Sequence, residues 1–126
     1  MISSKLKAEL KATSFNARSL RNKFNEFRAI VYFENFNLIA ITETWCNFKG
    51  RDFEFEYKMN GYQLFHRDRI NRVGGGVIVY VKDTLRVTEI EIENIDGVEI
   101  TGVIVDTGSA MLTFVNVYRP PNTSPS

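Results

Sequence analysis

The chain has 126 residues, a formal net charge of +1, 44% hydrophobic residues and 25% charged residues, which is the composition of one globular domain or of part of one. Its single cysteine excludes an internal disulfide, and no apolar run approaches the roughly 18 residues that a membrane-spanning helix needs. The near-neutral charge excludes no partner, but nucleic acid would have to bind a local basic patch. We expect a soluble, intracellular protein without a membrane partner, with the nucleus as one candidate location.

The N-terminal region predicts a short strand. Residues 1–9 are rich in lysine and are expected to be frayed. Residues 10–17 (LKATSFNA) then favour an extended conformation, and the predicted strand ends at Asn16. This places a polar side chain at the carboxyl end of the strand.

A helix and a second strand are expected next. Four apolar residues recur at steps of four, three and four, the stripe of an amphipathic helix: Leu20, Phe24, Phe27 and Val31. Ser19 is the candidate N-cap, and Asn35 or Asn37 would end the helix. Residues 38–41 (LIAI) are all apolar, as in a strand that is buried on both faces. Together these elements predict a βαβ crossover and hence a parallel pair of strands.

The remaining residues predict a loop and an antiparallel meander. Residues 45–60 are polar and aromatic without a period, as in a loop. The strands expected after it are residues 61–65, 77–81, 86–94, 98–106 and 111–118, of which 86–94 alternates Glu with Ile. Residues 119–126 contain three prolines and predict a loop tail. Periodicity thus predicts an α/β (α+β) mixed sheet with helical cover on one face, and its uncovered face suggests that part of the fold is missing or supplied by a partner.

Polar residues stand at the ends of three predicted strands: Asn16, Glu43 and Tyr118. Because the carboxyl ends of parallel strands meet at one edge of a sheet, Asn16 and Glu43 could lie together there. A carboxylate beside an amide oxygen suits Mg²⁺, which usually takes only one or two protein carboxylates. Alternatively, Asn16 is a turn residue, Glu43 is an exposed carboxylate without a function, and Tyr118 packs its ring on the core.

A basic segment precedes three consecutive glycines in "HRDRINRVGGG". Its arginines, Arg67, Arg69 and Arg72, could bind phosphates, because a guanidinium group pairs with phosphate oxygens through two hydrogen bonds. The alternative is a solvated turn that Asp68 partly neutralises. The glycines do not form a P-loop, since no Gly-Lys-Ser/Thr follows them, and the single histidine excludes a metal site with several His ligands.

Five segments in their expected order resemble the endonuclease/exonuclease/phosphatase superfamily: SFNARSLRNKFNEF, LIAITETW, GYQLFHRDR, GGGVIVYVKD and VNVYRPPN. They are most similar to the endonuclease domain that precedes the reverse transcriptase in non-LTR (LINE-type) retrotransposons, and they cover nearly the whole chain from Thr13 onward. The resemblance implies a DNase I-like two-sheet α/β sandwich with a phosphodiester-cleaving site that uses Mg²⁺ or Mn²⁺. It also implies that residues 1–126 are a single partial domain, its N-terminal half.

The resemblance implies roles for individual residues. Asn16 matches the asparagine that supports the metal and the catalytic network, Glu43 matches the metal-ligating glutamate, and Tyr118 matches the tyrosine whose hydroxyl reaches the scissile phosphate. The implied contacts to the DNA backbone are Arg67, Arg69, Arg72 and Asn122. Asn122 departs from the family pattern, since many relatives have the asparagine one position earlier, where this chain has Pro121.

The later motifs of the family are absent from the sequence: an Asp-x-Asn pair, a further Asp and a terminal Asp-His. Those groups activate water and stabilise the charge that develops on the phosphate. We therefore expect a truncated DNA endonuclease domain that is inactive without the missing C-terminal half. The alternatives are a non-catalytic nucleic-acid-binding or interaction fragment, and a phosphoinositide or sphingolipid phosphoesterase of the same superfamily.

Overall fold

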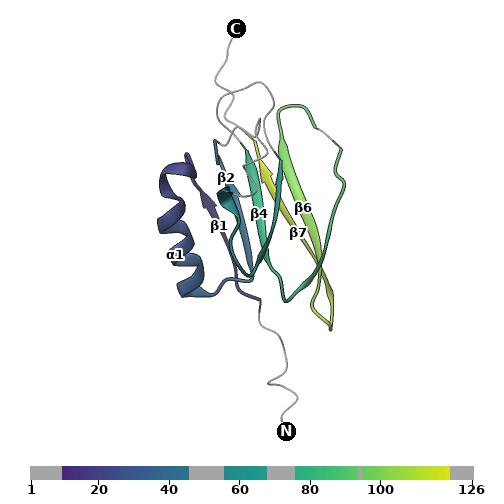
Figure 1. Cartoon of the computed structure of the whole chain (residues 1–126). Helices are drawn as coiled ribbons and strands as arrows, with labels where there is room; N and C mark the ends of the chain where they lie inside the picture. The colour runs from purple at the N-terminus through teal and green to yellow at the C-terminus, as the bar shows by residue number, and fades with distance from the viewer. Residues whose placement is uncertain (1–9, 46–55, 68–75, 94, 120–126) are drawn as a thin grey trace.

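The computed structural model describes residues 10–45, 56–67, 76–93 and 95–119, which form two β-sheets and one long helix (Figure 1). The elements are β1 (Ala12–Asn16), η2 (Arg21–Lys23), α1 (Phe24–Glu34), β2 (Leu38–Thr42), β3 (Tyr62–Arg67), β4 (Val77–Lys82), β5 (Arg86–Glu89), β6 (Glu99–Asp106) and β7 (Met111–Tyr118). The first sheet has the strand order β1-β2-β4-β3, and the second has the order β5-β6-β7. No helix in these described ranges is long and apolar enough to cross a membrane.

The predicted βαβ unit is confirmed. Strands β1 and β2 pair in parallel, from Ala12 opposite Leu38 to Asn16 opposite Thr42. Helix α1 connects them and lies on one face of the first sheet, where it buries Phe27 and Val31 (Figure 1). The carboxyl ends of both strands therefore meet at the same edge of the sheet.

The end of the helix was predicted correctly, but its beginning was not. Asn35 adopts the left-handed conformation (φ 57°), and its N–H donates to the Val31 carbonyl, so it ends the helix as expected. Ser19 is not the N-cap, because α1 begins only at Phe24, after η2. The Ser19 N–H instead donates to the Glu43 carbonyl at 3.0 Å. Ser19 thus belongs to the backbone hydrogen bonding that continues beyond the ends of β1 and β2.

The two-sheet sandwich that the resemblance implies is confirmed, and the structure shows how the strands of the predicted meander divide between the sheets. Strands β3 and β4 join the first sheet, with β4 antiparallel between β2 and β3. Strands β5 to β7 form a separate antiparallel sheet that covers the second face of the first sheet, so this cover comes from the chain itself and not, as expected, from a missing part or a partner. The physical reason lies in β4: all five residues from Val77 to Val81 are fully buried, so this strand needs cover on both faces.

The strand predicted over residues 86–94 ends at Glu89. Beyond that point the chain still follows β6, because the Ile90 N–H donates to the Gly102 carbonyl at 2.9 Å. A side chain added at Gly102 would lie 3.3 Å from the Cδ1 atom of Ile92 and 3.5 Å from that of Ile90. The two isoleucines thus pack over a glycine of the second sheet, and this segment is not the regular charged strand that the alternation predicted.

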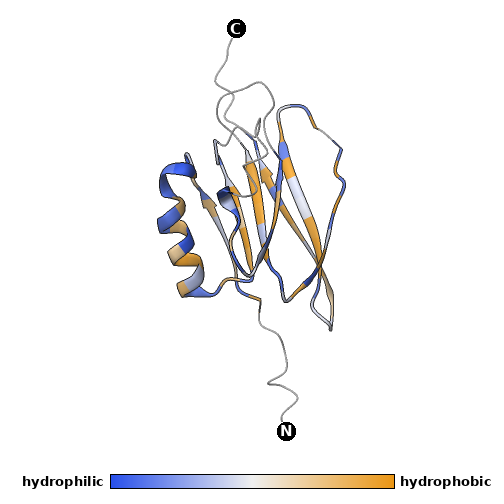
Figure 2. Ribbon diagram, viewed as in Figure 1, coloured by the Kyte–Doolittle hydropathy of each residue, from blue (hydrophilic) through white to orange (hydrophobic). Residues whose placement is uncertain are grey.

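Two hydrophobic layers hold the fold together, and Figure 2 shows apolar residues concentrated on the central strands. Alternate residues of β2 and β4 face α1 and form one cluster with the helix: Ile39, Ile41, Ile78 and Tyr80. The residues between them face the second sheet, where Leu38, Val79 and Val81 form the other cluster with Val103 and Val105 of β6. The second cluster is what binds the two sheets to each other.

We expect Leu38→Ala to lower the free energy of unfolding by about 2–5 kcal/mol, because Leu38 is only 1% exposed and its removal leaves a cavity between the sheets. Met111→Ala is the control, since Met111 is 69% exposed and should change stability by about 0.5 kcal/mol or less. Urea denaturation of both variants measures the difference. Similar losses in the two variants would contradict the assignment of Leu38 to the core.

Candidate active site

Two of the predicted site residues are in contact at the carboxyl ends of β1 and β2. The Asn16 side-chain Nδ2 donates to the Glu43 carboxylate oxygen Oε2. Asn16 is the last residue of β1 and lies opposite Thr42 in the parallel register, while Glu43 is the first residue after β2. The pairing of the strands thus brings together two side chains that are 27 positions apart in the sequence.

The backbone around this pair is held in an unusual conformation. Three bonds continue the pairing past the strand ends: Ala17 N–H to Thr42 O at 2.9 Å, Ser19 N–H to Glu43 O at 3.0 Å and Leu20 N–H to Thr44 O at 2.9 Å. Four of the five described non-glycine residues with positive φ lie here: Arg18, Ser19, Glu43 and Trp45. Such conformations cost about 1–3 kcal/mol each and concentrate at functional sites. The strain is therefore an independent signal for a site around Glu43.

A second set of contacts supports the residue after Glu43. Thr44 is 1% exposed, and its N–H donates to the Gly76 carbonyl at 3.3 Å. The Gly76 N–H in turn donates to the buried Glu99 carboxylate, at 3.1 and 3.3 Å to its two oxygens. A Cβ atom at Gly76 would lie 2.3 Å from Thr44 Oγ1, so only glycine fits this approach. Sequence reasoning missed both Gly76 and Glu99, although a glycine immediately before a buried strand is a signal of close packing.

Tyr118 lies at the same end of the sandwich, on the facing sheet. Strands β1, β2 and β7 run toward one end of the molecule in Figure 1, and Tyr118 is the last residue of β7, opposite Glu99. Two residues earlier, Asn116 donates to the carbonyl of Ile41 in β2. Since Glu43 is also two residues beyond Ile41, Tyr118 and Glu43 reach about the same level on the two layers.

Of the predicted DNA contacts, Arg67 lies in the described part of the chain. It ends β3 and pairs with Val77, which pairs on its other side with Thr42. Arg67 is therefore two strands, roughly 10 Å, from the end of β2. Its guanidinium donates to the Ile92 carbonyl at 3.3 Å, which directs the side chain toward the second sheet. The other three, Arg69, Arg72 and Asn122, fall outside the described residues.

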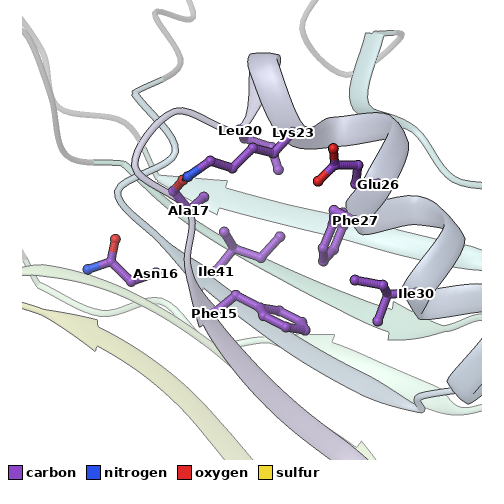
Figure 3. Close-up of a pocket in the computed structure, with 9 residues that line it drawn as sticks. All are labelled: Phe15, Asn16, Ala17, Leu20, Lys23, Glu26, Phe27, Ile30 and Ile41. Carbon is purple, nitrogen blue, oxygen red and sulfur yellow. The ribbon is translucent and has the colours of Figure 1, made fainter.

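A groove of about 150 Å³ adjoins Asn16 on the helix side of the first sheet (Figure 3). Its walls are mainly apolar: Phe15, Leu20, Phe27, Ile30 and Ile41. Lys23 also lines it, but its Nζ donates to the Ala17 carbonyl at 2.6 Å. Figure 3 shows the Asn16 amide directed away from the groove. The polar pair thus lies on the opposite face of the sheet, the face that looks toward the second sheet.

The side chains of Asn16 and Glu43 suit a divalent cation that has few protein ligands. Within the described ranges there is no group of three or more His, Cys, Asp or Glu side chains that could hold a metal. Mg²⁺ needs no such group, since it retains waters and takes one or two carboxylates. Because the Asn16 nitrogen faces Glu43, the amide orients the carboxylate, and its own oxygen points elsewhere. The geometry thus favours Glu43 as a ligand and Asn16 as its hydrogen-bonding support.

Solved structures with the same fold were found by structural comparison. An AP endonuclease from Leishmania major matches with a TM-score of 0.69 and 19% identity, over 86% of this chain and 40% of that structure. The endonuclease domain of TRAS1, a telomere-specific non-LTR retrotransposon, matches with a TM-score of 0.66 and 14% identity, over 91% and 47%. ANGEL2, a 2′,3′-cyclic phosphatase, matches with a TM-score of 0.61 and 13% identity, over 85% and 40%.

These structures confirm the class of fold inferred from the sequence motifs. The chain has part of the two-sheet α/β sandwich that these three structures share, and it spans less than half the length of each of them. No family model matches the sequence. No curated protein matches it either.

We expect Gly76→Ala to lower the free energy of unfolding by about 3 kcal/mol, because the new methyl group clashes with Thr44 and φ is +92°. Gly108→Ala separates the two causes, since Gly108 has φ +89° but no atom within 4 Å of the added Cβ. It should cost only the backbone strain, about 1–2 kcal/mol. Urea denaturation compares them, and equal losses would contradict the close packing between Gly76 and Thr44.

Proposed function

We propose that this chain is part of a DNA endonuclease domain of the non-LTR retrotransposon type, which cleaves phosphodiester bonds with Mg²⁺ or Mn²⁺. The observation that carries the proposal is the contact between Asn16 and Glu43 at the carboxyl ends of two parallel strands. The shared fold with the TRAS1 endonuclease domain and the retrotransposon-like motifs around Glu43 and Tyr118 support it.

Each residue of the proposed site has a distinct task. Glu43 would hold the metal, and its carboxylate is oriented by the Asn16 amide, so less conformational freedom is lost when the ligand binds. Tyr118 would donate its hydroxyl hydrogen to a phosphate oxygen from the facing sheet. A bound divalent cation would supply electrostatic stabilisation of the charge that develops on the phosphate.

The site needs more of the fold than this chain contains. The chain spans 40–47% of the length of the three similar structures. In the described part of the chain β7 is an outer strand, and its eight residues, MLTFVNVY, include no charge. Four of its side chains are exposed and apolar: Met111, Leu112, Val115 and Val117. Long uncharged edge strands tend to pair further, so we propose that the remaining half of the sandwich adds to β7 and that the chain alone is inactive.

DNA is the proposed substrate, bound through its phosphate backbone. Arg67 supplies a positive charge at the end of β3, level with Thr42 and thus close to Glu43 along the strand direction. One neighbour with this fold is a 3′ phosphatase from Neisseria bound to a product DNA hairpin, which supports the proposal by analogy. A purely binding fragment would keep this contact and lack the metal.

Mn²⁺ should bind the chain at Glu43, and Glu43→Gln should weaken binding by at least about tenfold, because the neutral amide is a poor ligand. Asn16→Ala should weaken it less, since it removes only the group that orients the ligand. Water-proton relaxation measures the titration, and Glu89→Gln on β5 is the matched control. Binding that is equally strong in the wild type and in Glu43→Gln would reject the site.

Activity gives the complementary test. A longer polypeptide in which this chain is joined to the rest of the fold should nick supercoiled plasmid in the presence of Mg²⁺. Glu43→Ala should reduce that rate by several orders of magnitude, because groups of one catalytic site act as a unit. Nicking that is undiminished by this substitution would refute the proposed role of Glu43, and Glu43-dependent nicking by the present chain alone would refute its inactivity.

DNA binding should be weak and should depend on salt. Arg67→Ala is expected to reduce the slope of log binding constant against log salt concentration by about one, the value for one lost phosphate contact. Arg86→Ala is the control, because Arg86 lies opposite Asp106 in the β5–β6 ladder, at the far end of the second sheet. Fluorescence anisotropy with a short duplex gives both slopes. An unchanged slope in Arg67→Ala would remove Arg67 from the proposed DNA surface.

A further inference from the structure

We infer that Asn116 is a positioning residue that holds Tyr118 level with the Asn16–Glu43 pair. The inference rests on the proposed function and adds a residue to which the sequence analysis assigns no role. Asn116 lies on β7, is only 5% exposed, and points toward the first sheet. A buried amide between two β-sheets is costly unless its hydrogen bonds are satisfied, so its presence calls for an explanation.

The Asn116 amide nitrogen donates to two carbonyl groups of the first sheet. Its partners are the Ile41 carbonyl of β2 and the Ile78 carbonyl of β4, both at 3.0 Å. Ile41 and Ile78 lie directly opposite each other in the β2–β4 ladder. One side chain of the second sheet therefore binds two neighbouring strands of the first, with both of its amide hydrogens used.

These hydrogen bonds fix a degree of freedom that the apolar contacts leave open. The side chains between the sheets are mainly aliphatic, and apolar burial has no preferred direction. A small shift of β7 along β2 would change that burial little. Hydrogen bonds depend strongly on distance and angle, so the two bonds of Asn116 define the position of β7 against Ile41 and Ile78.

The position of β7 decides where Tyr118 lies. Tyr118 follows Asn116 by two residues and shares its face of the strand, because side chains alternate with a period of two. Glu43 follows Ile41 by two residues at the end of β2. An advance of two residues along a strand covers about 7 Å, and both strands run toward the same end of the molecule (Figure 1). Asn116 thus fixes β7 relative to the β2 backbone, and the position of β7 in turn determines where Tyr118 lies.

The experiment follows Tyr118 by ¹⁹F NMR in the full chain, with 3-fluorotyrosine at its five tyrosines. Tyr118→Phe assigns the resonance. Added Mn²⁺ should broaden the Tyr118 signal in the wild type, and paramagnetic broadening falls steeply with distance. In Asn116→Leu, which keeps the volume and removes the donors, we expect at least about threefold less broadening. The Mn²⁺ affinity itself should change less than twofold, since Glu43 is untouched.

A control variant separates positioning from general loss of stability. Thr101→Val alters the residue opposite Asn116 on β6, also buried, and keeps the amide in place. It should leave the broadening of Tyr118 unchanged. Equal broadening of the Tyr118 signal in wild type and Asn116→Leu would overturn the role of Asn116. Broadening that persists in Glu43→Gln would overturn the metal site instead. In that case the position of Tyr118 is compared in the metal-free spectra.

The metal-free spectra provide the independent arm. Without Mn²⁺, the Tyr118 resonance should shift in Asn116→Leu and stay near its wild-type position in Thr101→Val; an unmoved resonance in Asn116→Leu would overturn the inference whether or not metal binds. Should Asn116→Leu fail to fold, Asn116→Thr is used, because it suits a strand and keeps one donor. It should give an intermediate shift, and a wild-type spectrum for this variant would also overturn the inference.

Discussion

The parallel pairing of β1 with β2 is the constraint on which the candidate site depends. It sets Asn16 opposite Thr42 and so beside Glu43. The backbone bonds that continue past Asn16 hold the following residues against the end of β2, and the positive φ angles of Ser19 and Glu43 are part of that arrangement. The pairing of the two strands therefore fixes the side chains of Asn16 and Glu43 relative to each other.

The second sheet turns this edge into a site with two sides. Tyr118 comes from β7, and Asn116 ties that strand to carbonyl groups of the first sheet. Glu99 makes a comparable tie from β6 to Gly76, next to Thr44. Buried polar bonds of this kind are directional, so they specify how the layers fit together, while the aliphatic cluster supplies most of the stabilisation.

Much of the first sheet could be predicted because its signals are local. The all-apolar run in β2 and the helical stripe before it are typical of a βαβ unit, and the rule for parallel strands then places Asn16 near Glu43. The N-cap could not be predicted in the same way. Ser19 has a suitable side chain, but its N–H is taken by the Glu43 carbonyl, a partner far away in the sequence.

The kinds of elements, the ends of most of them and the motifs they carry could be predicted from local patterns, since hydrophobic period and turn residues act over a few positions. The tertiary structure was needed to show that β3 and β4 join the first sheet while β5, β6 and β7 form the second. It also decided that Asn116 binds Ile41 and Ile78, which are 75 and 38 positions away. Such contacts arise from the packing of whole layers against one another, and the periodicity of a single strand does not record which distant strand will face it.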